Sequence, residues 1–177
     1  MKVAVAIALG LALVLALLPE FNRYEGEHHL YRASSLFQSL LQRHAAENQG
    51  AVFELAVASA NAATDSLPGD SRPLILAGSL RLFAHQPTEA LAAYRKAFNL
   101  GERPEIDLNL GLAFEMDGNH PAASAAILRA AWISPPIILA LPENLKAPLQ
   151  AAIAHDAELL RHHRLGAPPP LPADLSQ

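Results

Sequence analysis

The chain has eight histidines and no cysteine, and these residues define the side-chain chemistry that is open to it. His155, Glu158 and His162 follow one another at intervals of three and four, which places all three on one face of a helix. Imidazole and carboxylate groups are ligands that zinc and other divalent ions accept. One hypothesis is therefore a metal-binding or hydrolytic protein that uses this helix.

Other patterns argue against catalysis. Solvated histidines on a polar helix face would give the same spacing, and the chain has no zinc-protease signature, no phosphate-binding loop and no G-x-S-x-G turn. The lack of cysteine excludes a disulfide framework, a thiolate metal site and a cysteine nucleophile. We therefore predict a protein that is not an enzyme, with no catalytic residue, no metal and no cofactor.

Composition indicates a small all-α protein. Of its 177 residues, 51% are hydrophobic and 6% are aromatic, which suits tightly packed helices. The formal net charge of -4 and the pI near 6.0 provide no basic patch, so nucleic acid is not an expected partner.

An uninterrupted apolar run from Val3 to Leu18 predicts membrane targeting. Its length of about 24 Å as a helix is short of a bilayer core, and it fits an anchor or a signal peptide. Phe21 and Tyr24 extend the run with residues suited to the interface, and no small-x-small cleavage site follows it. We therefore expect residues 1–24 to form a transmembrane anchor or an uncleaved signal.

Charge around this run predicts its orientation. Lys2 precedes it, and the residues that follow, from Glu20 to Glu27, sum to a negative charge. The N-terminus should then stay cytoplasmic, by the positive-inside rule. The expected location is the inner membrane, single-pass, with the soluble domain in the periplasm.

A pattern of small and large residues occurs twice, thirty-three positions apart. Gly78 recurs as Gly111, and three further pairs keep the same offset: Ala90 and Ala123, Tyr94 and Ile127, Ala97 and Ala130. A period in the low thirties is typical of a helix-turn-helix unit that buries its apolar face against a neighbour. We expect these eight residues to form the packing positions of the repeat, with the six glycines and alanines where antiparallel helices approach most closely.

The second copy closely resembles the tetratricopeptide repeat (TPR). It contains Leu110-Gly111, Phe114, Gly118, Ala123, Ile127, Ala130 and Pro135. The first copy departs from the family pattern at Arg81, His85 and Glu102, which replace the aromatic residue, the turn glycine and the closing proline. The resemblance implies two repeats over residues 72–135 and a TPR-like antiparallel helix-turn-helix solenoid preceded by one transmembrane helix.

The segments on either side are expected to complete this array. Residues 25–66 should form a stalk helix and an N-terminal capping hairpin, because terminal repeats are atypical in such arrays. Residues 137–166 should contain a C-terminal capping helix over Glu143–Leu165, and the Pro-rich tail, 167–177, should be extended or disordered.

The resemblance also implies a binding face. In this family helix A lines the inner groove, at positions that here are Arg72, Ile75, Ser79, Leu82 and Phe83 in the first repeat and Glu105, Leu108, Leu112, Glu115 and Met116 in the second. Such a groove suits an amphipathic helix or an extended peptide. We expect Phe83, Leu112 and Met116 to anchor the bound segment. Arg72 and Glu115 should orient it.

The resulting prediction is a membrane-anchored adaptor that binds a peptide or helix of another membrane or periplasmic protein in its TPR groove, in the assembly of a cell-envelope complex. An alternative is a fixed structural subunit of a larger membrane complex, since the small residues among positions 4–12 would allow close helix packing. Metal binding through His155, Glu158 and His162 is the other alternative.

Overall fold

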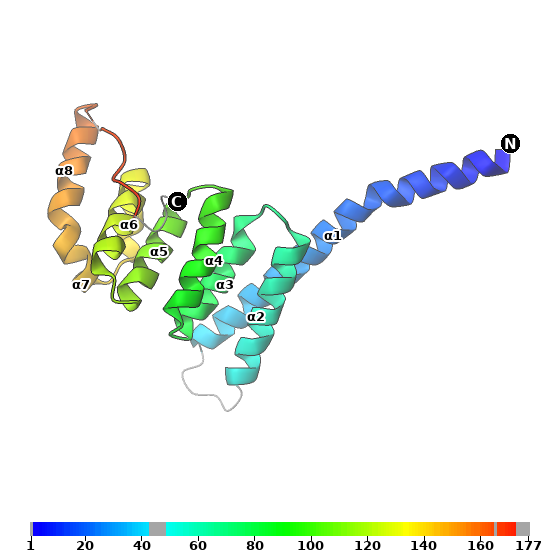
Figure 1. The fold of residues 1–177 in the computed structure, drawn as a ribbon, viewed down its shortest axis with the longest axis horizontal. Coiled ribbons are helices and arrows are strands. Elements are labelled where there is room, and N and C mark those ends of the chain that lie inside the picture. Colours follow the sequence, from blue (N-terminus) through cyan, green and yellow to red (C-terminus); the bar gives the residue numbers. More distant parts are fainter. Residues whose placement is uncertain (1, 43–48, 165, 173–177) are drawn as a thin grey trace. The chain divides into compact units, whose positions relative to one another are not determined.

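The computed structural model describes residues 2–42, 49–164 and 166–172, of which residues 2–15 and 140 are described as backbone alone. Every regular element in these ranges is a helix, and the helices pack in sequential antiparallel pairs (Figure 1). The chain divides into two compact units, residues 1–76 and 77–177, and the boundary falls inside α3. The expectation of an all-α fold is confirmed.

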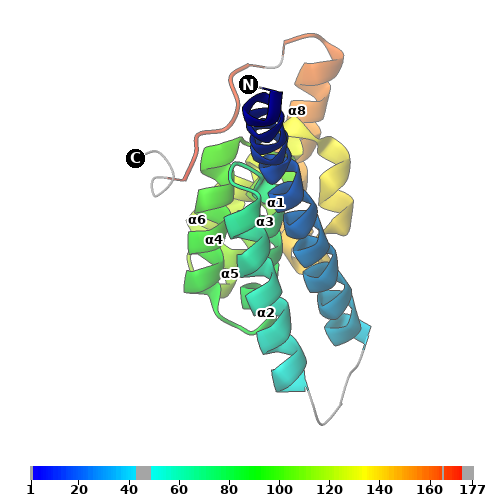
Figure 2. The same ribbon diagram turned by 90° about the vertical axis from the view of Figure 1, so that its right-hand side faces the viewer.

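The first unit is built on a helical hairpin. Helix α1 (Lys2–Gln42) runs without interruption through Pro19, and α2 (Gln49–Ser66) returns beside it in the opposite direction (Figures 1 and 2). Leu30 and Ala63 pack with Leu67 at its centre. A side chain at Gly26 would meet Leu67, since an added Cβ would lie 2.5 Å from its Cγ. Glycine at this position therefore lets the hairpin close.

The predicted anchor, residues 3–18, belongs to α1, and its first thirteen residues lie outside the described side chains. In the part of the chain whose structure is described, no helix has both the length and the apolar character needed to cross a membrane.

The thirty-three-residue period recurs in the bounds of the helices. Helix α3 (Ser71–Phe83) and α5 (Pro104–Met116) begin and end thirty-three positions apart, and so do α4 (Pro87–Leu100) and α6 (His120–Ile133). Prolines occupy the opening turns of α4, α5 and α6, where their missing N–H costs nothing. This arrangement is consistent with a repeating helical array.

The turns inside the two copies also match. His85 and Gly118, again thirty-three positions apart, both have positive φ, at 57° and 81°. Each residue closes a helix through the same pair of backbone hydrogen bonds, in which the next residue, Gln86 or Asn119, donates to a carbonyl five positions back. His85 departs in type from the turn glycine of the repeat pattern, yet its backbone has the conformation that glycine adopts at this turn.

Close helix contacts in the second unit centre on the two glycines. An added Cβ at Gly78 would lie 2.5 Å from the ring of Tyr94, and one at Gly111 would lie 2.5 Å from Cγ1 of Ile127. The six other residues of the repeated pattern are all buried: Ala90, Tyr94, Ala97, Ala123, Ile127 and Ala130. The large residue of each copy therefore fills the space that the glycine of the facing helix leaves open.

The C-terminal segment differs from the expected single helix over Glu143–Leu165. It forms a 3-10 helix η1 (Pro135–Ala140), a short α7 (Glu143–Lys146), a second 3-10 turn η2 (Ala147–Leu149) and α8 (Gln150–Arg161). Pro148 lacks the N–H that an uninterrupted helix would use, and the 3-10 turn forms around it. Helix α8 ends at Arg161, because His163 takes a positive φ of 53°.

Candidate functional site

The predicted groove residues of the first repeat are partly engaged within the protein. Arg72 donates to the Glu27 carboxylate at 2.5 Å and to the Asp70 carboxylate at 2.6 Å. Ser79 lies 3.1 Å, oxygen to oxygen, from the Tyr94 hydroxyl, and burial raises the pKa of that phenol to about 12. Phe83, at the end of α3, remains 40% exposed. Ile75 and Leu82 are half-buried.

The predicted groove residues of the second repeat differ in their exposure. Leu108 is 8% exposed and lies in a cluster with Leu141 and Leu149, and Leu112 packs against the same cluster. The segment Pro135–Leu149 therefore covers this part of α5. Leu108 is a core residue in this structure, and Leu112 is partly covered. Met116, one turn beyond Leu112, is 42% exposed.

An open cleft of about 250 Å³ lies where the C-terminal segment meets the second repeat. Glu115 belongs to its lining, and no other residue of the predicted groove does. The other lining residues come from α6 and from the segment that covers α5: His120, Ala123, Ser124, Ile127, Asn144, Leu145, Pro148 and Leu149. The sequence could not reveal this site, because one of its walls is the unexpected fold of residues 144–149.

The cleft has one polar and one apolar side. Glu115 Oε2 lies 2.9 Å from Nδ1 of His120, which opens α6. The Asn119 side chain caps the same helix by accepting from the N–H of Ala122. Leu145 and Leu149 provide the apolar side. The arrangement suits a short chain segment that has one apolar and one polar or charged side chain.

A buried carboxylate was missed by the sequence analysis. Asp107 on α5 is 1% exposed, and its Oδ2 has no hydrogen-bond partner among the described residues. Burial, together with the neighbouring Glu102 carboxylate, raises the pKa of Asp107 to about 7. Arg129 binds Glu102 and lowers the pKa of Glu102. No spacing signal links these residues, since α6 brings Arg129 back to a loop twenty-seven positions earlier.

Arg129 also contacts the Pro-rich tail. Its Nη1 donates to the carbonyl oxygen of Pro169 at 2.6 Å, and Pro172 is buried. The tail was expected to be extended or disordered, and its described part, residues 166–172, contains no helix. The contact with α6 was not expected.

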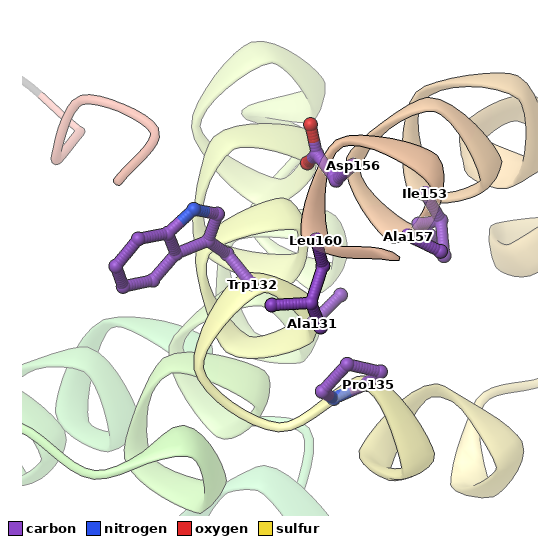
Figure 3. A pocket seen from close by; sticks show the side chains of 7 residues that line it. All are labelled: Ala131, Trp132, Pro135, Ile153, Asp156, Ala157 and Leu160. Carbon is purple, nitrogen blue, oxygen red and sulfur yellow. The ribbon is translucent and has the colours of Figure 1, made fainter. Parts of the chain in front are cut away.

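Two further hollows lie elsewhere. A small apolar hollow of about 20 Å³ is bounded by Ala131 and Trp132 of α6 and by Ile153, Ala157 and Leu160 of α8 (Figure 3). This volume is close to that of a single water molecule. In the first unit, a polar hollow of about 520 Å³ is lined by Arg23, Glu27, Asp70 and Arg72 with neighbouring residues of α1 and the α2–α3 turn. Its two carboxylates already bind Arg72.

The histidine hypothesis finds no assembled ligand set. Glu158 accepts from Arg161 at 2.7 Å and lies 2.8 Å from Nε2 of His162, while His155 is exposed and joins neither contact. Among the residues that the structure describes, no three His, Asp or Glu side chains converge as metal ligands.

No protein-family model, curated protein or solved structure matches this chain. By its fold the chain is an all-α protein of sequential antiparallel helix pairs, and this arrangement is consistent with a helical repeat array.

Proposed function

We propose that the protein is a TPR-like adaptor, held at the inner membrane by its N-terminal residues, that binds a segment of another envelope protein. The observation that carries this proposal is the cleft at Glu115, which combines a polar and an apolar side where the C-terminal segment meets the second repeat. Met116, the next residue, adds exposed apolar surface at the end of α5.

The period of the helices supports the TPR-like part of the proposal. Helix bounds, turn conformation and the contacts of Gly78 and Gly111 all repeat at the spacing of thirty-three. Arrays of this kind are binding scaffolds in which the terminal units differ from the inner ones. The α1–α2 hairpin would be the N-terminal cap and residues 135–161 the C-terminal cap.

The exposed residues of α1 favour a second candidate, a fixed subunit of a larger membrane complex. Leu17, Phe21, Tyr24 and Tyr31 are all at least half exposed, and their spacing puts them on one face of the helix within an arc of about 80°. A stripe of this kind is usually covered by a membrane interface or by another helix. Cover by another helix would hold the protein in a complex, which is what the second candidate requires.

The test compares a cleft variant with a matched control in full-length protein. The chain is purified in mild detergent with its bound partner, as wild type, as Glu115→Ala with Met116→Ala, and as Glu89→Ala, an exposed acid on α4. We expect the double variant to lose the partner and Glu89→Ala to keep it. The captured protein is then purified and titrated against all three, with an expected loss of at least tenfold in affinity for the double variant.

The opposite pattern would reject the adaptor. If the double variant keeps its partner and Phe21→Ala with Tyr24→Ala loses it, the stripe on α1 makes the contact, and the protein is a fixed subunit.

A further inference from the structure

The tail returns from the end of α8 to α6. In Figures 1 and 2 the segment that follows α8 runs back to the neighbourhood of α6, and the hydrogen bond from Arg129 to the carbonyl of Pro169 joins residues forty positions apart. Pro172, three positions further along the tail, is also buried.

Each of the three guanidinium nitrogens of Arg129 donates a hydrogen bond in this arrangement. Its Nε and Nη2 bind the two carboxylate oxygens of Glu102, the latter at 2.8 Å, and Nη1 binds the tail. The Arg129 side chain is 13% exposed, so a guanidinium N–H without an acceptor there would be costly. The carbonyl of Pro169 therefore satisfies a donor that is partly buried.

A proline-rich segment suits this donor. Pro168, Pro169, Pro170 and Pro172 have no N–H, and a residue that precedes proline is restricted to extended conformations. The carbonyls of such a chain have no internal partners, and its extended form loses little entropy on binding. Proline-rich ligands are bound elsewhere by aromatic surfaces with hydrogen-bond donors.

Trp132 provides the aromatic group. It lies three positions after Arg129 on α6, a spacing that makes the two residues neighbours on the helix surface. Its indole N–H is buried, with no acceptor among the described residues. Figure 3 shows its ring directed away from Ile153 and Ala157 of α8.

We propose that the α6 surface at Arg129 and Trp132, termed here the Arg129 site, binds extended proline-rich chain, and that the protein's own tail, residues 166–172, is its reversible resident ligand. Glu102 holds the guanidinium of Arg129 in place, and Arg129 donates a hydrogen bond to a proline carbonyl. Trp132 supplies apolar surface. This site is separate from the cleft at Glu115, so either proposal can fail without the other.

The test uses the full-length chain with one fluorescent label on the tail. The protein has no cysteine and one tryptophan, so a bimane label on Pro170→Cys is unique and Trp132 is its one tryptophan quencher. Pro170 follows the residue that Arg129 binds, and Trp132 lies three positions after Arg129 on α6. With the tail docked at the Arg129 site, the label should approach Trp132. We expect strong quenching in the otherwise wild-type chain, and its relief in the Arg129→Lys variant, because lysine lacks the fork that binds Glu102 and the tail together.

Two additions keep the test independent of folding. Replacing Pro168 and Pro169 by glycine leaves α6 untouched and should also relieve quenching, because a flexible tail loses more entropy on docking. A synthetic peptide of residues 166–172 should displace the labelled tail, with half-release at a concentration on the order of millimolar, the effective concentration of a short tether. The same peptide with alanine in place of its four prolines is the matched control and should release little.

Several outcomes would overturn the proposal. Quenching that neither variant changes would mean that the tail does not occupy the Arg129 site. Variants that relieve quenching while the peptide has no effect would make the tail a fixed part of the fold rather than a reversible ligand. Equal release by the alanine peptide would show that the site does not select proline.

Discussion

Asp107 shows how burial and charge set the behaviour of a single residue. Its carboxyl is buried beside Glu102, and the pKa of this group is raised from 3.8 to about 7. The folded protein therefore holds a proton that the unfolded chain releases at about pH 4. Between these two values the folded state binds more protons than the unfolded state, so stability falls as the pH rises.

This linkage gives a pH-dependent prediction. From pH 5 to pH 8 we expect Asp107 to lower the free energy of unfolding by an amount on the order of 2 kcal/mol, and Asp107→Asn to remove that part of the dependence. Urea unfolding of both proteins at the two pH values measures it. Asp117→Asn, an exposed change at the end of the same helix, is the control and should leave the pH slope as in the wild type. If the free energy of unfolding falls with pH equally steeply in Asp107→Asn and in wild type, the raised pKa of Asp107 is contradicted.

The paired turns allow a prediction on backbone strain. His85 is exposed and has the positive φ that glycine adopts freely and other residues adopt at a cost. We expect His85→Gly to stabilise the protein by about 0.5 kcal/mol, after the added freedom of the unfolded chain is counted. At the equivalent position, Gly118→Ala should destabilise it by about 1 kcal/mol. Thermal unfolding of the two variants measures both changes in stability. Changes in the same direction would mean that the two turns do not share one conformation.

Among individual residues, the prediction of the binding face was limited by contacts that spacing does not encode. Leu108 has the type and position of a groove residue, yet Leu141 and Leu149 cover it. Arg72 was expected to orient a ligand and instead binds Asp70 and Glu27. A distant segment covers Leu108, and Arg72 is bound both by its near neighbour Asp70 and by Glu27, forty-five positions away.

At the level of the helices, close packing depends on the glycines that face large residues. In Gly111→Ala the new Cβ would lie 2.5 Å from Ile127 and 3.2 Å from the carbonyl oxygen of Ala123, which is backbone and cannot easily move. We expect a loss of about 1–2 kcal/mol by overpacking, despite the better helix propensity of alanine.

Gly50 offers the matched control for this change. It lies in the first turn of α2, and an added Cβ would meet nothing within 4 Å. Gly50→Ala should therefore be neutral or stabilising in the same urea unfolding experiment. A loss in Gly50→Ala as large as that in Gly111→Ala would show that the cost is not one of packing.

The helices themselves were largely predictable, and the C-terminal ones were not. Period, prolines and turn residues located the repeat helices, because local sequence fixes where such helices begin and end. One continuous helix was expected from Glu143, and the chain instead forms the short helix α7 and a 3-10 turn before α8. Its conformation follows from Pro148 and from packing on α5, and neither effect has a periodic signature.

For the whole molecule, the membrane proposal leads to a fractionation experiment. We expect the full chain to sediment with membranes and to stay there after a high-salt or carbonate wash, because apolar burial is insensitive to both. Deletion of residues 3–18 should move it to the soluble fraction. The variant Phe21→Ala with Tyr24→Ala tests the exposed stripe on α1 separately. Full release of the intact chain by carbonate would contradict a spanning anchor.

The identical spacing of helix bounds has a consequence for how such a chain can change length. A duplicated cassette of thirty-three residues, cut in either of the matched turns, would insert two whole helices and restore the register of every residue after it. A gain or loss of one residue inside a helix would instead rotate the residues after it by about 100° about the helix axis and turn part of their buried face outward. An array of this kind therefore lengthens by tandem duplication in steps of one whole repeat.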